Sequence, residues 1–174
     1  MEIERKFKIT KIPDNLEQYN KKEIIQGYLC TEPVVRIRKS NEKYLLTYKN
    51  KSNLNQEHAV ISDEVELPLT KASFEHLLTK VDSEVIKKTR YLIPLLQGYT
   101  AELDIFHGKL SGHMFVEVEF PSEKDAIEFC KPDWFGEDVS KDIRYRNSYL
   151  ISISSLAELH LDAVSYTHLT LPTT

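Results

Sequence analysis

Alternation of apolar and polar residues dominates the chain and predicts β-strands. The opening segment shows the pattern, with Ile3 and Phe7 on one face and Glu2, Glu4 and Lys6 on the other. The same period of two recurs along most of the first 120 residues, interrupted by short turns. We expect strands at 2–10, 23–31, 34–40, 43–50, 57–68, 84–95, 99–107 and 113–120.

Helical patterns are few and short. Apolar residues spaced three and four apart predict a helix over 70–80, with Thr70 as its N-cap. A second helix is expected to begin at Ser122 and to end before Pro132, and a short helical turn is expected over 14–20. Many antiparallel strands with few helices predict a mainly β (α+β) domain, built as a barrel or a sandwich.

Composition and charge narrow the class of protein. The 174 residues carry 23 Lys+Arg and 27 Asp+Glu, a formal net charge of −4, which fits one domain with no nucleic-acid partner. No apolar run reaches the roughly 18–20 residues of a membrane span, and the charged start MEIERKFKIT is unlike a signal peptide, so we expect a cytoplasmic protein without membrane contact. Neither GxGxxG nor GxxxxGK occurs, which excludes the two common nucleotide-binding motifs.

The charges on the predicted strands are sorted by sign. Most strands carry a same-sign pair two residues apart, such as Arg36 with Arg38 or Glu117 with Glu119. A sandwich with a solvated outer face explains any one such pair, but a surface shaped only for solubility intersperses the two signs. Same-sign pairs are explained better by a barrel with the charges inside. There, carboxylates converge on a hard cation and basic groups converge on an anion.

The number of charges indicates the kind of ligand. The convergent basic residues exceed what a monophosphate or a carboxylate engages, and they suit a polyanion such as a triphosphate; they are Lys6, Arg36, Arg38, Lys49, Lys88 and Arg90. The facing carboxylates would repel such an anion unless divalent cations lay between them, and Mg²⁺ is the expected ion. These carboxylates are Glu2, Glu4, Glu64, Glu66, Glu102, Asp104, Glu117 and Glu119.

An ordered series of motifs resembles one known superfamily. The opening Glu2-x-Glu4-x-Lys6 resembles the ExExK signature of the CYTH, or triphosphate tunnel metalloenzyme, superfamily. The resemblance continues through QGYL, VRIRK, Thr47-x-Lys49, EVELPL, KKTRY, AELDIF, FVEVEF and DIRYRNSYL, and it spans about residues 1–150. It implies an eight-stranded antiparallel barrel enclosing a tunnel that binds a triphosphate with a divalent metal, Mg²⁺ or Mn²⁺.

The resemblance, together with the charge pattern, assigns roles to these residues. Substrate phosphates are expected to be bound by Arg36, Arg38, Lys49, Lys88, Arg90 and Arg144, and the metal by the eight carboxylates named above. Lys6 and Lys88 are expected to lie near each other, which would lower a lysine pKa and let one act as general base. Tyr28 is expected to orient the attacking water or that lysine.

Three activities compete within this interpretation. Metal-dependent hydrolysis of a triphosphate-containing small molecule needs only phosphate contacts, metal and water. Adenylate cyclase activity of class IV type also needs an adenine pocket, for which the sequence shows no feature. A non-catalytic polyphosphate-binding module would not need eight carboxylates. A lipocalin-like barrel would need an apolar lumen. As for oligomeric state, the protein is expected to be a monomer or a homodimer.

The C-terminal segment differs from the rest of the chain. Residues 147–174 contain no Lys or Arg, and the final SYTHLTLPTT shows no helical period. We therefore expect the domain to cover residues 1–150 and the tail 151–174 to lie outside the fold, with 165–174 exposed.

Overall fold

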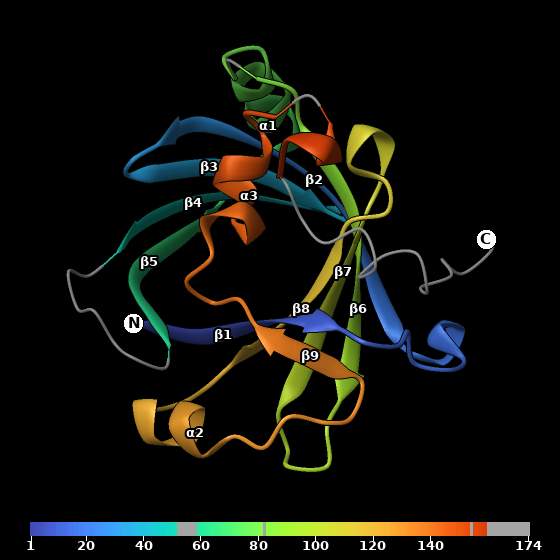
Figure 1. The fold of residues 1–174 in the computed structure, drawn as a ribbon. Coiled ribbons are helices and arrows are strands. Elements are labelled where there is room, and N and C mark those ends of the chain that lie inside the picture. The colour runs from blue at the N-terminus through green and yellow to red at the C-terminus, as the bar shows by residue number, and fades with distance from the viewer. Residues whose placement is uncertain (52–58, 82, 154, 160–174) are drawn as a thin grey trace.

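The computed structural model describes residues 1–51, 59–81, 83–153 and 155–159, and nine strands dominate it (Figure 1). The strands are β1 (Glu2–Ile9), β2 (Asn20–Thr31), β3 (Val34–Ser40), β4 (Lys43–Lys51), β5 (Val60–Pro68), β6 (Ile86–Pro94), β7 (Thr100–Phe106), β8 (Met114–Glu119) and β9 (Phe135–Asp138). The helices are α1 (Lys71–Leu78), α2 (Glu123–Glu128) and α3 (Asn147–Leu150). Single 3₁₀ turns occupy Leu16–Gln18, Gly108–Leu110, Ile143–Tyr145 and Leu156–Leu159. No helix among these residues is long and apolar enough to cross a membrane.

Eight strands close into an antiparallel barrel, which confirms the predicted fold. The sheet order is β5-β4-β3-β2-β6-β7-β8-β1-β9, and β5 pairs with β1 to close the barrel. Glu2 lies opposite Ser62 at this closure. Closure leaves no free edge among the eight strands.

The eight predicted strands are all present, with their ends displaced by a few residues. The start of the fifth prediction, 57–58, lies outside the described residues. The strand β9 lies outside the predicted strands, because its four residues, FGED, show no period of two. This strand pairs with the end of β1, and Ile9 lies opposite Phe135.

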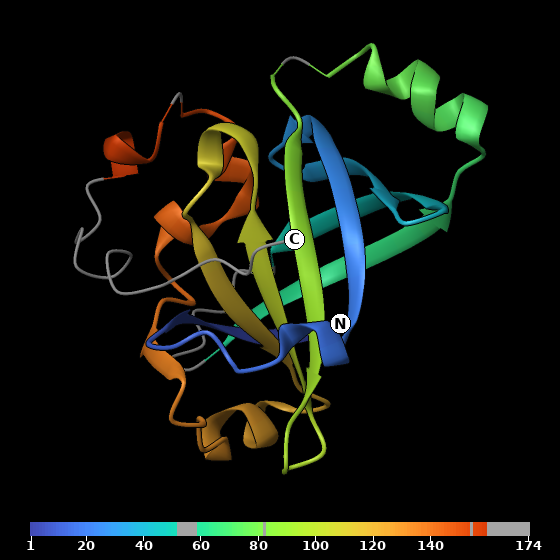
Figure 2. The ribbon, with the colours of Figure 1, turned by 90° about the vertical axis from the view of Figure 1, so that its right-hand side faces the viewer.

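The two predicted helices begin at the expected caps. The Thr70 side chain accepts a hydrogen bond from the Ser73 amide, and Ser122 does the same for Asp125. Figure 2 shows α1 projecting from the barrel beyond the end of β5. The ring of Phe74 joins it to the barrel by packing 5.2 Å from the ring of Tyr44.

Two apolar cores surround the charged interior. One covers the outside of the barrel, where residues of β1, β7 and β8 such as Phe7, Leu103 and Val116 pack under α2 and β9. The other joins Tyr28, Phe106 and Phe115 of the barrel to the C-terminal segment. The alternating pattern therefore gives an apolar outer face under α2 and β9, and an inner face that is mostly charged but apolar where Tyr28, Phe106 and Phe115 meet the C-terminal segment.

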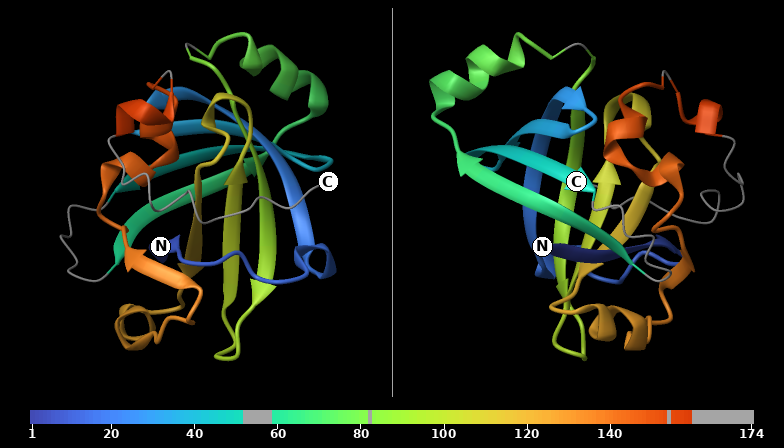
Figure 3. Two further views of the ribbon diagram at one scale, coloured as in Figure 1. Left: turned by 45° about the vertical axis from the view of Figure 1, so that its right-hand side comes forward. Right: turned by 90° about the vertical axis from the view of Figure 1, so that its left-hand side faces the viewer.

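The C-terminal segment extends the second core beyond residue 150. Ile153 is 4% exposed and Leu159 is 1% exposed, and both belong to this core with Tyr145 and Leu150. Figure 3 shows the segment, coloured orange to red, running beside β7 and β8. The expected boundary at residue 150 therefore falls inside the packed region, because apolar residues after it find a surface that sequence periodicity does not reveal. The expectation that 165–174 are exposed lies outside the described residues.

Ending the chain at Ser155 is expected to lower Tm by about 4–20 °C. This truncation removes Leu159, and losing a buried leucine costs about 2–5 kcal/mol, in a domain where each kcal/mol shifts Tm by about 2–4 °C. Thermal unfolding followed by circular dichroism measures the change. A chain ending at His160 is the matched control, and equal Tm values for the two would contradict the packing of Leu159.

Candidate active site

A cavity of about 500 Å³ collects most of the predicted site residues. Their side chains come from β1 to β6 and β8, whose inward-facing positions repeat every second residue. The predicted residues that line it are Glu2, Glu4, Lys6, Tyr28, Arg36, Arg38, Lys49, Glu64, Glu66, Arg90, Glu117 and Glu119. The same-sign pairs thus meet in one space, as the barrel interpretation requires.

Arginines from β3 and β6 form the basic wall of the cavity. Arg38 Nε donates to Gln26 Oε1 at 2.9 Å, and Arg36 donates to Thr47 Oγ1 at 3.3 Å. Burial, followed by the nearby Arg36 and Arg90, lowers the pKa of Arg38 to about 9. Because these guanidinium groups repel one another, an anion bound among them would stabilise all of them.

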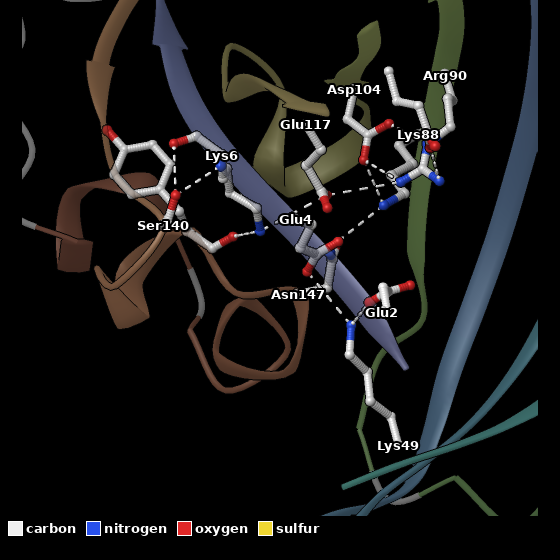
Figure 4. A network of polar contacts seen from close by, with 12 residues as sticks. Glu2, Glu4, Lys6, Lys49, Lys88, Arg90, Asp104, Glu117, Ser140 and Asn147 are labelled. Atoms are coloured by element: carbon white, nitrogen blue, oxygen red, sulfur yellow. Dashed lines mark hydrogen bonds and ion pairs between the residues drawn. The ribbon is translucent and has the colours of Figure 1, made fainter. Parts of the chain in front are cut away.

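Asp104 anchors the basic wall from behind. It binds the Nε and Nη2 atoms of Arg90 at 2.7 and 2.9 Å, and it accepts from Lys88 Nζ at 2.7 Å (Figure 4). Burial would raise the pKa of Asp104, but Arg90 and Lys88 hold it below its usual value. Glu102 also pairs with Arg90, at 2.5 Å.

Glu102 and Asp104 do not line the cavity, in contrast to the metal role predicted for them. Asp104 is fully buried, and its carboxylate is already bound to two cations. The sequence pattern placed both acids on the correct face of β7. It did not show that Arg90 would pair with both acids and Lys88 with Asp104.

Lys88 is enclosed, and its neighbours differ from those expected. It is 1% exposed and lies behind the residues that line the cavity. Burial, and then the positive charges of Arg90 and Arg38, lower its pKa to about 7 despite the opposing effect of Asp104. The like charges that lower this pKa come from the two arginines rather than from Lys6, which was expected to supply them.

Lys6 instead lies at the cavity surface, next to the C-terminal segment. Its Nζ donates to the Tyr145 carbonyl at 2.6 Å and lies 3.8 Å from Glu117 Oε1. Its backbone amide donates to Ser140 Oγ at 2.9 Å. Lys6 therefore joins the acidic wall to the segment that follows β9.

Carboxylates from β1, β5 and β8 form the acidic wall. Burial, followed by the charge of Glu117, raises the pKa of Glu4 to about 8. Burial and contact with Glu64 raise the pKa of Glu2. Lys49 Nζ lies 2.5 Å from Glu2 Oε1 and 3.5 Å from Glu4 Oε1, so an ammonium group bridges the two acids.

The acidic wall fits a divalent cation. No three His, Cys, Asp or Glu side chains among the described residues form a metal cluster by themselves. The pKa values of Glu2 and Glu4 are raised, so a nearby positive charge stabilises their ionised forms. Lys49 supplies one such charge between the two carboxylates. Mg²⁺ characteristically takes one or two protein carboxylates and completes its shell with water and phosphate oxygens. The pairs present are therefore a suitable donor set for an ion shared with a phosphate ligand.

The segment after β9 supplies cavity residues that the sequence analysis missed. Ser140, Arg146, Asn147 and Ser148 all line the cavity. Arg144, the arginine that was predicted, instead binds Asp142 at 2.6 Å and the Leu159 carbonyl at 3.3 Å, outside the cavity. Arg144 lies within the 3₁₀ turn over Ile143–Tyr145, and Arg146 follows this turn. DIRYRN marked the segment, but no strand period showed which arginine faces inward.

Comparisons with known proteins match the chain to one family. Residues 1–145 match the CYTH domain. An inorganic triphosphatase of Nitrosomonas europaea is 38% identical over 152 residues, which cover 86% of this chain and 95% of the relative. An inorganic triphosphatase of Acetivibrio thermocellus is 38% identical over 128 residues, covering 72% of this chain and 78% of that protein.

A solved structure agrees with these relatives. The crystal structure of an inorganic triphosphatase has a TM-score of 0.64 and 37% identity, and the match covers 89% of this chain and 97% of that one. The family predicted from the series of motifs is thereby confirmed. With its first 145 residues matched to the family and its sequence and fold similar to those of these relatives, the chain belongs to the CYTH domain family.

Proposed function

We propose that this protein hydrolyses inorganic triphosphate with the help of Mg²⁺ or Mn²⁺. One observation carries the proposal: arginines and carboxylates together line a single cavity of about 500 Å³, with Arg36 4.0 Å from Glu64 and Arg90 3.9 Å from Glu117. The arginines can bind the oxygens of a linear polyanion. The carboxylates can hold the cations that offset the charge of the polyanion. The names of the two relatives at 38% identity support this substrate.

The residues divide into three groups by role. Phosphate oxygens bind Arg36, Arg38, Arg90 and Arg146, and Lys49, which pairs with Glu2, is a further phosphate ligand. The metal ligands are drawn from Glu2, Glu4, Glu64, Glu66, Glu117 and Glu119. An ion held there supplies neutralisation of phosphate charge and activation of water.

Proton transfer is the task of the third group. A water oxygen attacks the terminal phosphorus, the bond to the bridging oxygen breaks, and orthophosphate and diphosphate leave. We assign the water's proton, passed on through one intervening water molecule, to the Lys88 amine behind the cavity wall, since a pKa of about 7 leaves much of that amine neutral at physiological pH. Tyr28, which lines the cavity, orients the water.

Parallel assays of several substrates test the proposal. Orthophosphate release from tripolyphosphate, ATP, GTP and thiamine triphosphate is measured with Mg²⁺ or Mn²⁺, and cyclic AMP is measured with ATP. Tripolyphosphate is expected to be the fastest substrate. Faster formation of cyclic AMP than of phosphate would identify a cyclase, and binding of tripolyphosphate without turnover would identify a non-catalytic module.

Replacing Arg38 by alanine is expected to lower kcat/KM for tripolyphosphate by about 10–100-fold, since a hydrogen bond to a charged group contributes about 1.5–3 kcal/mol. Both KM and kcat should change, because the clamp acts on bound substrate and on the transition state. Arg144→Ala is the matched control, since Arg144 binds Asp142 outside the cavity. Equal losses in the two variants would refute the placement of Arg38 at the substrate.

A further inference from the structure

The Lys88 amine is held from two sides. Asp104 accepts one of its hydrogen bonds at 2.7 Å, and the side-chain oxygen of Asn147 accepts another at 3.1 Å. Figure 4 shows Asn147 opposite Asp104 at this amine. The Asn147 amide must turn its oxygen toward Lys88, because a lysine ammonium group only donates.

Asn147 is the member of this group that reaches the cavity. It is half-buried and lines the cavity, whereas Lys88 and Asp104 do not. It belongs to α3, which the fully buried Leu150 anchors in the second core. The neighbouring Tyr145 carbonyl binds Lys6 Nζ at 2.6 Å, so the same segment also fixes a lysine of the cavity surface.

Asp104 alone does not define the position of the amine. It shares its carboxylate between Lys88 and Arg90, and of these three groups only Arg90 lines the cavity. A second acceptor on the cavity side limits the rotation of the lysine side chain and keeps Nζ next to that wall. A neutral amide does this without adding another negative charge.

We infer that Asn147 is a positioning residue for Lys88, holding its amine at the cavity wall through the side-chain amide oxygen. The inference rests on the proposed function for its kinetic test, since it gives Lys88 a task in turnover. Its geometry involves β6, β7 and α3, and thus joins the C-terminal segment to the chemistry of the barrel. The competing role for Asn147 is direct contact with substrate.

Steady-state kinetics with tripolyphosphate separates the two roles. Asn147→Ala is expected to lower kcat by about 10–100-fold with KM within about threefold, because a displacement of about 1 Å costs up to about 10²-fold in rate. Asn147→Leu removes the acceptor but keeps the volume, and it should behave alike even if the alanine variant folds poorly. A raised KM with unchanged kcat would overturn the inference in favour of substrate contact. Unchanged kcat in both variants would also overturn it.

A double-mutant cycle shows whether Asn147 acts through Lys88. In the Lys88→Met background, Asn147→Ala should change kcat by less than about twofold, since the partner is already absent. The same loss in both backgrounds would overturn the inference. Ser152→Ala is the matched control, because Ser152 is exposed in the same segment and its Oγ donates to the Tyr149 carbonyl.

A spectroscopic measurement needs no activity. In protein labelled with ¹⁵N-lysine, the ¹H–¹⁵N signal of the Lys88 amine, assigned by its loss in Lys88→Met, is expected to shift in Asn147→Ala and to remain in place in Ser152→Ala. An unmoved signal in Asn147→Ala would overturn the inference. A moved signal in a protein that releases no phosphate would leave the hydrogen bond standing and refute the proposed function instead.

Discussion

Chelation of divalent cations with excess EDTA is expected to abolish phosphate release from tripolyphosphate, and added Mg²⁺ or Mn²⁺ should restore it. The reason lies in the charges of the cavity lining. Six basic side chains, Lys6, Arg36, Arg38, Lys49, Arg90 and Arg146, face six carboxylates, Glu2, Glu4, Glu64, Glu66, Glu117 and Glu119, so the lining is close to neutral. A polyanion entering such a lining meets carboxylates that repel it unless cations intervene. Full activity in EDTA would contradict the metal requirement.

Glu4→Gln sharpens this test. Glu4 lies 3.5 Å from Lys49, and burial together with the charge of Glu117 raises its pKa. The variant should raise the Mg²⁺ concentration at half-maximal activity by about tenfold or more, if one ligand contributes about 1.4 kcal/mol or more. Glu102→Gln is the matched control, since Glu102 binds Arg90 and does not line the cavity. Equal metal requirements in the two variants would show that Glu4 is no ligand.

Replacing Lys88 by methionine is expected to lower kcat by about 10²–10⁴-fold, the usual contribution of a general base. Its lowered pKa adds a pH dependence whose direction follows from the base role. The amine accepts a proton only when neutral, so kcat/KM should rise as the pH rises through about 7 and level off above it. Initial rates between pH 5.5 and 9 measure both effects.

Lys6→Met separates a lysine base from a metal-bound hydroxide. Lys6 lies at the cavity surface, where Tyr145 and Glu117 hold its amine, and no proton transfer is assigned to it. We expect a smaller loss of kcat in this variant and an unchanged rise with pH. Near-normal turnover in Lys88→Met would leave the metal as the activator of water. A rise with pH retained in that variant would identify a different base.

The strand periods predicted which face each charge occupies, and they did so correctly across the barrel. Arg36, Arg38, Glu117 and Glu119 all line the cavity, because side chains two residues apart share one face of a strand. β9 escaped prediction, since four residues are too few to show a period. The cavity-facing position of Arg146 was not predicted, because this residue follows a 3₁₀ turn, where no period of two applies.

The sequence by itself determined the closed antiparallel barrel, the inward charges and the family, because each depends on local periods and ordered motifs. Only the tertiary structure decided which charges neutralise one another. Asp104 and Lys88 lie sixteen residues apart, yet they share a buried ion pair that removes both from the cavity surface. Asn147 reaches the same amine from the far end of the chain. Such contacts depend on how strands and the C-terminal segment pack in three dimensions. Burial and neighbouring charge, the two causes of the shifted pKa values, therefore follow from packing that one strand's sequence does not contain.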